Sequence, residues 1–427
     1  MLNLLLLSLL ILQDSDSGKD DVVEELTINF VTLDVRAFTK DDQPVKDLTL
    51  ADFEVSEGRK KVEITSFYVQ DLDEKRLVTM IPSNPKMKVS EGVSETMEAG
   101  NHFIFVLDLE SASLVEVRKT FSQLELFLDT LENDKNAEML LYSMTHGRIT
   151  PFMTDVSAFK TELIAYRTRI LDAMEGRMQV GGLTRNMTEV EKKFRRCQFL
   201  FKRKPRDLEL CINEELDIFV ELQKDLVRRT IGELEALTFK FKELDGLKTM
   251  FFVSPGFSLN PGSSALEMAA LFKSSGGSGR EGTQNTGFAD VASIDSFEDE
   301  FRRVIHACIK NRVVFNTFDI YNGNAEFDRN SSSEFNGGAS KTVLRAYRNY
   351  SMEMTAGMSQ LARESGGIHF RAPTLGKPMT RMFNQPGFVY VLGYQSPDGK
   401  PGKFRKIKIK CKRKGVKLLY RTGYFGQ

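Results

Sequence analysis

The sequence lacks a net charge, clustered metal-binding residues and the usual catalytic motifs. Lysine plus arginine and aspartate plus glutamate number 59 each over 427 residues, so no overall field draws the chain to nucleic acid. The cysteines have no CxxC spacing and the four histidines are scattered, which argues against a zinc site. No GxSxG, HExxH, P-loop or strand-following GxGxxG is present. We therefore expect no enzyme, with a hydrolase as the least favoured alternative.

Long apolar runs are also missing, apart from "MLNLLLLSLLILQ" at the start. The run from Leu2 to Leu12 is too short to cross a bilayer, but it has the length of a signal-peptide core. A basic start and a small-x-small cleavage site are absent, and a buried N-terminal helix is the alternative interpretation. We expect residues 1–24 to be a signal-like segment and polar spacer, the mature chain to lack a transmembrane span, and the protein to be secreted, periplasmic or in the cell envelope.

The four cysteines, Cys197, Cys211, Cys308 and Cys411, allow two interpretations. In an exported chain, Cys197 and Cys211 could close a small loop as a disulfide. The alternative is four unpaired structural thiols.

Both ends of the chain have the pattern of β-strands. Residues 25–72 alternate apolar and polar side chains between polar turns, which predicts a small N-terminal β module, sandwich-like in character. Residues 73–100 have no steady period and indicate a linker. Residues 386–427 again predict strands, including "FRKIKIKCKRK", whose lysines are typical of a protected edge strand.

Between these ends, residues 101–385 alternate strand and helix patterns. "HFIFVLDL" is a continuous apolar run, as expected for a parallel strand buried on both faces, and an amphipathic helix pattern follows it. Repetition of such units predicts an α/β fold with a doubly wound, mainly parallel sheet. Two segments interrupt it: a charged helical insertion at 186–244 and a flexible loop at 273–287.

Three stretches together resemble a known family. They are "VRAFTKDDQPVKDLTLADFEVSEGRKKVEITSF", the pair "FIFVLDLESAS" and "LKTMFFVSPGF", and the ending "FVYVLGYQSPDGKPGKFRKIKIKCKRKGVKLLYRTGYF". In this order they resemble the bacterial von Willebrand factor type A-related proteins, an exported group common in acidobacteria. The resemblance covers most of the chain from about residue 28 and implies a type A domain at 101–385.

Type A domains commonly hold Mg²⁺ in a metal-ion-dependent adhesion site with a DxSxS motif, a distant Thr and a distant Asp. By resemblance the first Asp is Asp108 and the Thr is Thr184 in "VGGLTRN". The two serine places fall on Glu110 and Ala112, although Ser111 and Ser113 lie one place along, and Pro255 takes the place of the distant Asp.

Two interpretations of this site follow. In one, Asp108, Glu110, Thr184 and Ser254 hold Mg²⁺ or Mn²⁺. In the other, which we favour, the site is degenerate and no cofactor is bound.

The resemblance implies a protein that binds another protein in the bacterial envelope, an adhesion-type module. The alternative is a structural or assembly factor in which the metal position plays no part.

Overall fold

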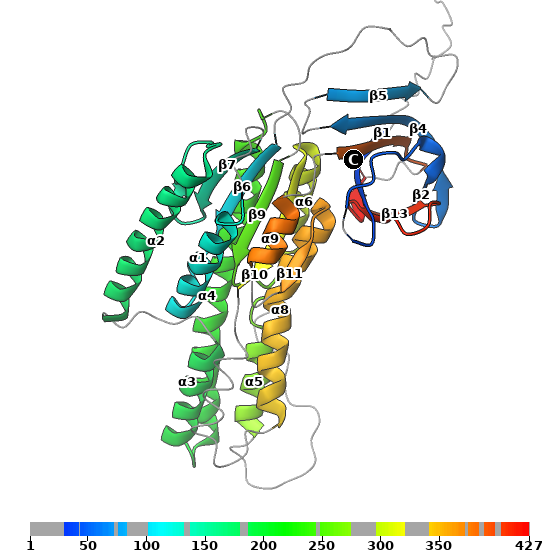
Figure 1. Ribbon diagram of the computed structural model, residues 1–427. Helices are drawn as coiled ribbons and strands as arrows, with labels where there is room; N and C mark the ends of the chain where they lie inside the picture. The colour runs from blue at the N-terminus through cyan, green and yellow to red at the C-terminus, as the bar shows by residue number, and fades with distance from the viewer. Residues whose placement is uncertain are drawn as a thin grey trace, which may run out of the picture.

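The computed structural model describes residues 30–41, 43–71, 76–82, 101–131, 137–179, 187–244, 248–274, 296–320, 341–371, 375–383, 388–397 and 403–426. The signal-like segment, Thr184 and residues 275–287 of the predicted flexible loop lie outside these ranges. Within them the chain is mixed α/β, as predicted, with one mostly parallel sheet and two antiparallel sheets (Figure 1).

The central sheet has six strands in the order β11-β10-β9-β6-β7-β8. All neighbouring pairs are parallel except β7 with the edge strand β8. The bounds are β6 Asn101–Leu107, β7 Ala137–Ser143, β8 Gly147–Arg148, β9 Lys248–Ser254, β10 Val313–Asp319 and β11 His369–Arg371. β9 and β10 are buried at every position, as expected for central parallel strands covered on both faces, and their apolar residues are interrupted by a few buried polar ones such as Asn316 and Thr317.

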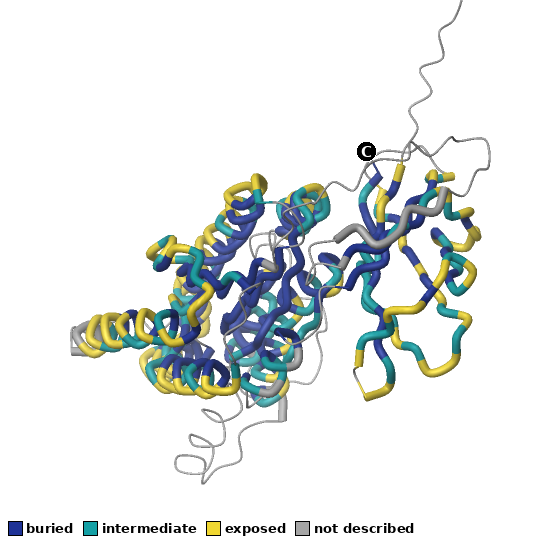
Figure 2. Tube along the Cα trace, turned by 45° about the horizontal axis from the view of Figure 1, so that its top comes forward, coloured by how far each residue is buried: buried dark blue, intermediate teal, exposed yellow. Residues whose placement is uncertain are grey.

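Helices cover both faces of this sheet. The bounds are α1 Leu114–Leu128, α2 Val156–Gln179, α3 Met187–Leu200, α4 Pro205–Lys240, α5 Ser263–Ser274, α6 Glu298–Lys310, α8 Lys341–Ser365 and α9 Gly376–Phe383. Side chains of α1, α2 and α9 pack on one face, where Phe105 lies, and those of α4, α6 and α8 pack on the other, where Val106 lies. Figure 2 shows the buried strands between helices whose outer sides are exposed.

A third group of helices extends beyond the sheet. The first half of α4 and parts of α3, α5 and α8 share a separate apolar cluster around Phe194, Leu216 and Met268. In Figure 1 these helices continue below the sheet as a bundle. α3 and α4 lie within the predicted helical insertion. Among the described residues, no helix is both long and apolar enough to cross a bilayer.

The two ends of the chain build one β-sandwich. One sheet has the order β14-β1-β12-β4-β5 and the other β15-β13-β2-β3. The N-terminal bounds are β1 Phe30–Phe38, β2 Phe53–Glu57, β3 Lys60–Val62, β4 Ile64–Asp71 and β5 Arg76–Pro82, with a short 3-10 helix at Leu50–Asp52. The C-terminal bounds are β12 Phe388–Gln395, β13 Phe404–Cys411, β14 Lys417–Leu419 and β15 Gly423–Phe425. Strands from the predicted N-terminal module and the predicted C-terminal segment therefore share both sheets. β13 lies between β15 and β2, so the prediction of an edge strand at "FRKIKIKCKRK" is wrong. Its lysines are exposed because they alternate with the buried Ile407 and Ile409 on an inner strand.

One strand lies inside the predicted linker. β5 pairs antiparallel with β4, from Ser66 opposite Pro82 to Asp71 opposite Arg76. Its sequence "RLVTMIP" has no polar alternation, so periodicity gave no strand signal there. β5 forms because the outer edge of β4 offers backbone hydrogen bonds, and a pairing of this kind leaves no mark in the sequence pattern.

Candidate functional site

Three polar residues meet at the carboxyl ends of three adjacent parallel strands. Ser254 ends β9 and Asp319 ends β10, and the two are register partners. Asp108 follows β6, and its N–H donates to the Val253 carbonyl over 2.9 Å. The strand order reverses between β6 and β9, which is where doubly wound sheets bind their ligands. The fold therefore places Asp108 and Ser254 at the position where a functional site is expected.

Asp108 is held by the neighbouring strand. The Ser254 hydroxyl donates to Asp108 Oδ2 over 2.8 Å, and the same hydroxyl oxygen accepts from the Gly256 N–H over 2.9 Å. Both side chains are buried, with Asp108 4% exposed and Ser254 0% exposed. The serine hydroxyl thus has a donor and an acceptor within the protein.

Burial raises the pKa of the Asp108 carboxyl to about 6, and the neighbouring charge of Glu110 adds to the increase. The hydrogen bond from Ser254 and the positive charge of Arg229 act in the opposite direction. Desolvation outweighs these stabilising contacts. Asp108 is therefore a carboxyl group that gains its negative charge only near neutral pH.

The Glu110 carboxylate forms an ion pair with a residue of α4. The carboxylate accepts from Arg229 Nη1 over 2.6 Å, in an ion pair whose side chains are 26% and 52% exposed. The sequence could not have indicated Arg229, because α4 reaches Glu110 only through the tertiary fold. In a metal site, the negative charge of Glu110 would have to replace the carboxylate that is missing at Pro255. Arg229 neutralises that charge.

The residues after Glu110 are used for helix packing and capping. Ala112 is buried against α1. Ser113 is the N-cap of α1: its hydroxyl accepts from the Glu116 N–H over 3.3 Å, and the Glu116 carboxylate accepts from the Ser113 N–H over 2.8 Å. This reciprocal capping box explains the serine without a metal.

The loop after β9 is packed against α8. Pro255 is buried, and Gly256 has a φ of +97°. A Cβ on Gly256 would lie 2.4 Å from the Met354 carbonyl oxygen, and the Phe257 N–H donates to that same oxygen over 3.1 Å. Glycine is needed here for both its backbone conformation and its lack of a side chain. The loop offers no carboxylate at the place of the distant Asp.

Asp319 was not predicted as a site residue. Its side chain is 1% exposed, it accepts from Thr355 Oγ1 of α8 over 2.9 Å, and Arg371 Nε lies 4.0 Å away. The sequence does contain a pattern that indicates it: "VVFNTFD" is an apolar strand that ends in aspartate, as "FIFVLD" is at Asp108. The structure brings Asp319 into the same row as Ser254.

These residues are a poor donor set for a divalent cation. Mg²⁺ needs several oxygen ligands in near-octahedral arrangement, whereas the Ser254 hydroxyl already donates to Asp108 and accepts from Gly256, and Glu110 is paired with Arg229. In the part of the chain that the structure describes, no group of three or more His, Cys, Asp or Glu residues is arranged to hold a metal ion. Thr184 lies outside that part.

The predicted cysteine pair lies far from this row of residues. Cys197 of α3 and Cys211 of α4 form a disulfide, while Cys308 and Cys411 are free thiols.

Compared with known proteins, the chain matches no family model, no curated protein and no solved structure.

Proposed function

We propose that this chain is an exported, non-enzymatic binding protein of the bacterial envelope, built on a von Willebrand type A-like domain with a degenerate metal position. It binds another protein, and no metal ion takes part. The type A assignment is supported by the strand order, which in chain order reads 3-2-1-4-5-6 with an antiparallel edge strand. Export is supported by the apolar run at residues 2–12 and by the disulfide, since disulfides persist in oxidising compartments.

The hydrogen bond between Ser254 and Asp108 is the observation that carries the degenerate-site proposal. The resemblance requires an aspartate at the end of β6, and Asp108 is there, but its partner is a protein hydroxyl. Below a pH of about 6, a cation would also have to displace the proton that this buried carboxyl holds.

Thermal melting with millimolar Mg²⁺ or Mn²⁺ tests this proposal. We expect the same melting temperature with either ion and with EDTA, because a ligand that binds only the folded state raises it. A rise in the wild-type protein that Asp108→Ala abolishes would sink the degenerate-site proposal. Asp299→Ala is the control, since Asp299 is an exposed aspartate in α6.

Affinity capture from an envelope extract tests the binding function. Tagged protein should retain the same partner in Mg²⁺ and in EDTA. Loss of the partner in EDTA would show that binding depends on a divalent ion, and failure to enrich any protein would count against a binding role.

A further inference from the structure

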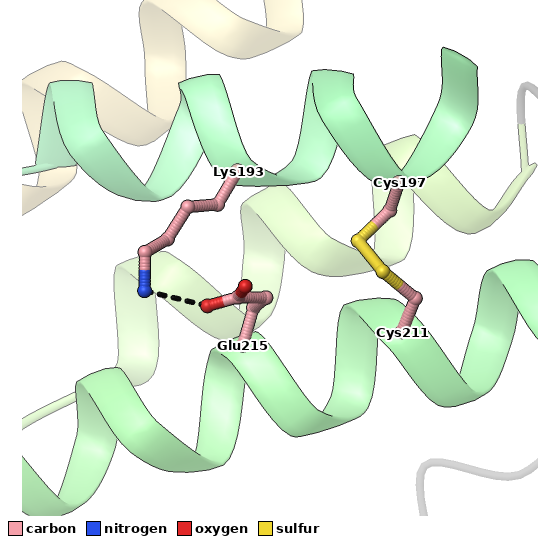
Figure 3. The surroundings of a disulfide bond; sticks show 4 residues. All are labelled: Lys193, Cys197, Cys211 and Glu215. Atoms are coloured by element: carbon pink, nitrogen blue, oxygen red, sulfur yellow. Dashed lines mark hydrogen bonds and ion pairs between the residues drawn. A yellow bond between two sulfur atoms is a disulfide. The ribbon is translucent and has the colours of Figure 1, made fainter. Parts of the chain in front are cut away.

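The end of the α3–α4 hairpin is a rigid projection. Cys197 and Cys211 join the two helices near their turn, and Lys193 Nζ lies 2.6 Å from Glu215 Oε2 on the side toward the sheet (Figure 3). α4 has 36 residues, and at about 1.5 Å per residue it is long enough to pack on the sheet at one end and extend well beyond it at the other. In Figure 1 the hairpin end lies at the far end of the helical bundle from the β-sandwich.

Large apolar side chains are exposed around this end. Phe199 is 83% exposed, Leu200 55% and Leu210 60%. Single exposed apolar residues are ordinary, but these three lie within one helical turn of the disulfide along the chain. Phe199 is the most exposed large apolar residue among the described ones.

Basic side chains surround them. The segment from Lys192 to Arg206 contains eight lysines and arginines and no aspartate or glutamate, in a chain with no net charge. Arg196, Lys202, Arg203 and Arg206 are all exposed. The other four basic residues of the segment pair with acidic side chains: Lys192 with Glu189, Lys193 with Glu215, Arg195 with Glu191 and Lys204 with Asp207. The positive charge around the apolar groups of the hairpin end therefore comes mainly from the four exposed residues named above. We call residues 196–210 the hairpin tip; it contains five lysines and arginines against Asp207 and Glu209.

We propose that the hairpin tip docks on an anionic lipid surface. Phe199 and Leu200 enter the boundary between headgroups and acyl chains, while the four exposed cations contact lipid phosphates. Exposed apolar residues beside Lys and Arg are the combination that binds charged membrane interfaces, and the long cationic side chains reach up to the headgroups. The disulfide keeps the tip from unfolding when it leaves water.

An anionic bilayer fits this tip better than a nucleic acid does. Both would attract the basic residues, but nucleic-acid recognition uses aromatic side chains that stack on bases. Phe199 could stack on a base, but Leu200 and Leu210 cannot, whereas all three side chains match acyl chains. This inference does not depend on the proposed protein-binding function or on Asp108.

Vesicle flotation with the full chain tests the proposal. We expect binding to vesicles of about 30% phosphatidylglycerol in phosphatidylcholine, and binding at least about tenfold weaker to phosphatidylcholine alone or in high salt. Phe199→Ser with Leu200→Ser should weaken binding about tenfold, and so should Lys202→Glu with Arg203→Glu. Circular dichroism verifies that each variant is folded.

Ile218→Ser is the matched control, because Ile218 is 51% exposed on α4 but lies two helical turns beyond Cys211, away from the tip. It should bind vesicles as the wild type does. Equal binding to neutral vesicles, unchanged binding by both tip variants, or binding to an oligonucleotide but not to anionic vesicles would each overturn the proposal.

Discussion

Asp108 carries a carboxyl group in a place with little water. Its pKa of about 6 in the folded chain compares with 3.8 for an ordinary aspartate, and burial is the main cause. Between these pH values the folded state holds a proton that the unfolded state has lost. The contribution of Asp108 to stability therefore falls as pH rises from about 4 to 6, and above 6 the ionised carboxylate costs up to about 3 kcal/mol.

Asp108→Asn should consequently stabilise the protein at neutral pH. The amide oxygen still accepts from Ser254, while the buried charge is gone. We expect the free energy of unfolding to rise by about 1–3 kcal/mol at pH 7.5, with the difference from wild type disappearing near pH 4. Urea denaturation at several pH values measures this. A difference that does not change with pH would show that the Asp108 charge is not its source.

Glu57 is the centre of a second buried polar network, in the sandwich. Its Oε2 accepts from Tyr394 and Tyr424, each over 2.9 Å, and its Oε1 accepts from Ser396 over 3.0 Å and lies 3.5 Å from Arg405 Nη1. Glu57 and Arg405 side chains are 5% and 4% exposed. The two tyrosines come from different sheets, so this carboxylate links the two layers.

Glu57→Ala should be strongly destabilising, because it removes the carboxylate that balances the buried Arg405 charge and accepts from two buried tyrosine hydroxyls. We expect a loss of about 3–5 kcal/mol in the free energy of unfolding, measured by urea denaturation. Glu54→Ala on the same strand removes an exposed ion pair with Lys61 and should leave the unfolding midpoint unchanged. If Glu54→Ala destabilised the protein as much as Glu57→Ala does, burial of the Glu57 network would not be the cause of its effect.

At the scale of elements, the disulfide stabilises one hairpin and not the whole chain. It closes a loop with a sequence separation of 14, and the helices it joins belong to an apolar cluster separate from the two faces of the sheet. Loop closure of this size contributes about 3 kcal/mol by restricting the unfolded state.

Replacing both Cys197 and Cys211 by Ser should therefore loosen α3 and the start of α4 selectively. Hydrogen exchange should become faster there, by about a hundredfold, and stay unchanged in β6 and β9. Cys411→Ser, at a half-buried free thiol in the sandwich, is the control. Faster exchange across the central sheet would contradict a local role.

Individual helices and strands were easier to predict from the sequence than the contacts between side chains of different elements. The apolar run of β6 and the three- and four-residue spacing of α1 predicted both correctly, and Asp108 follows from the first of them. The ion pair of Glu110 with Arg229 joins residues 119 apart, so it depends on how α4 packs. The position of Asp319 was predictable by the same rule as Asp108.

At the scale of the whole molecule, Arg312 joins the α/β unit to the sandwich. Its guanidinium donates to Asp34 over 3.0 and 3.3 Å and to Gln70 over 2.9 Å, and its backbone has a φ of 52°. The same junction contains a partly open pocket of about 650 Å³, lined by residues of both units. Val314 of β10 also packs against Val389 and Val391 of β12 at this junction, so the hydrogen bonds of Arg312 add polar contacts to an apolar one in holding the units together.

Arg312→Ala should separate the unfolding of the two units. We expect a loss of about 1–3 kcal/mol, since Asp34 and Gln70 lose their donor, and two calorimetric transitions in place of one. Arg303→Ala, at an exposed arginine of α6, should unfold as the wild type does. A single unshifted transition in Arg312→Ala would show that other contacts couple the units.

The shared sandwich has a consequence for how this chain is made. The Leu48 amide donates to the Tyr390 hydroxyl, which comes 342 residues later. At ordinary ribosomal speeds the early strands wait about 20 to 70 s for the strand that completes their sheet. During that interval their edges are unpaired and prone to aggregation. We therefore expect the first strands to need protection from aggregation until the last ones emerge.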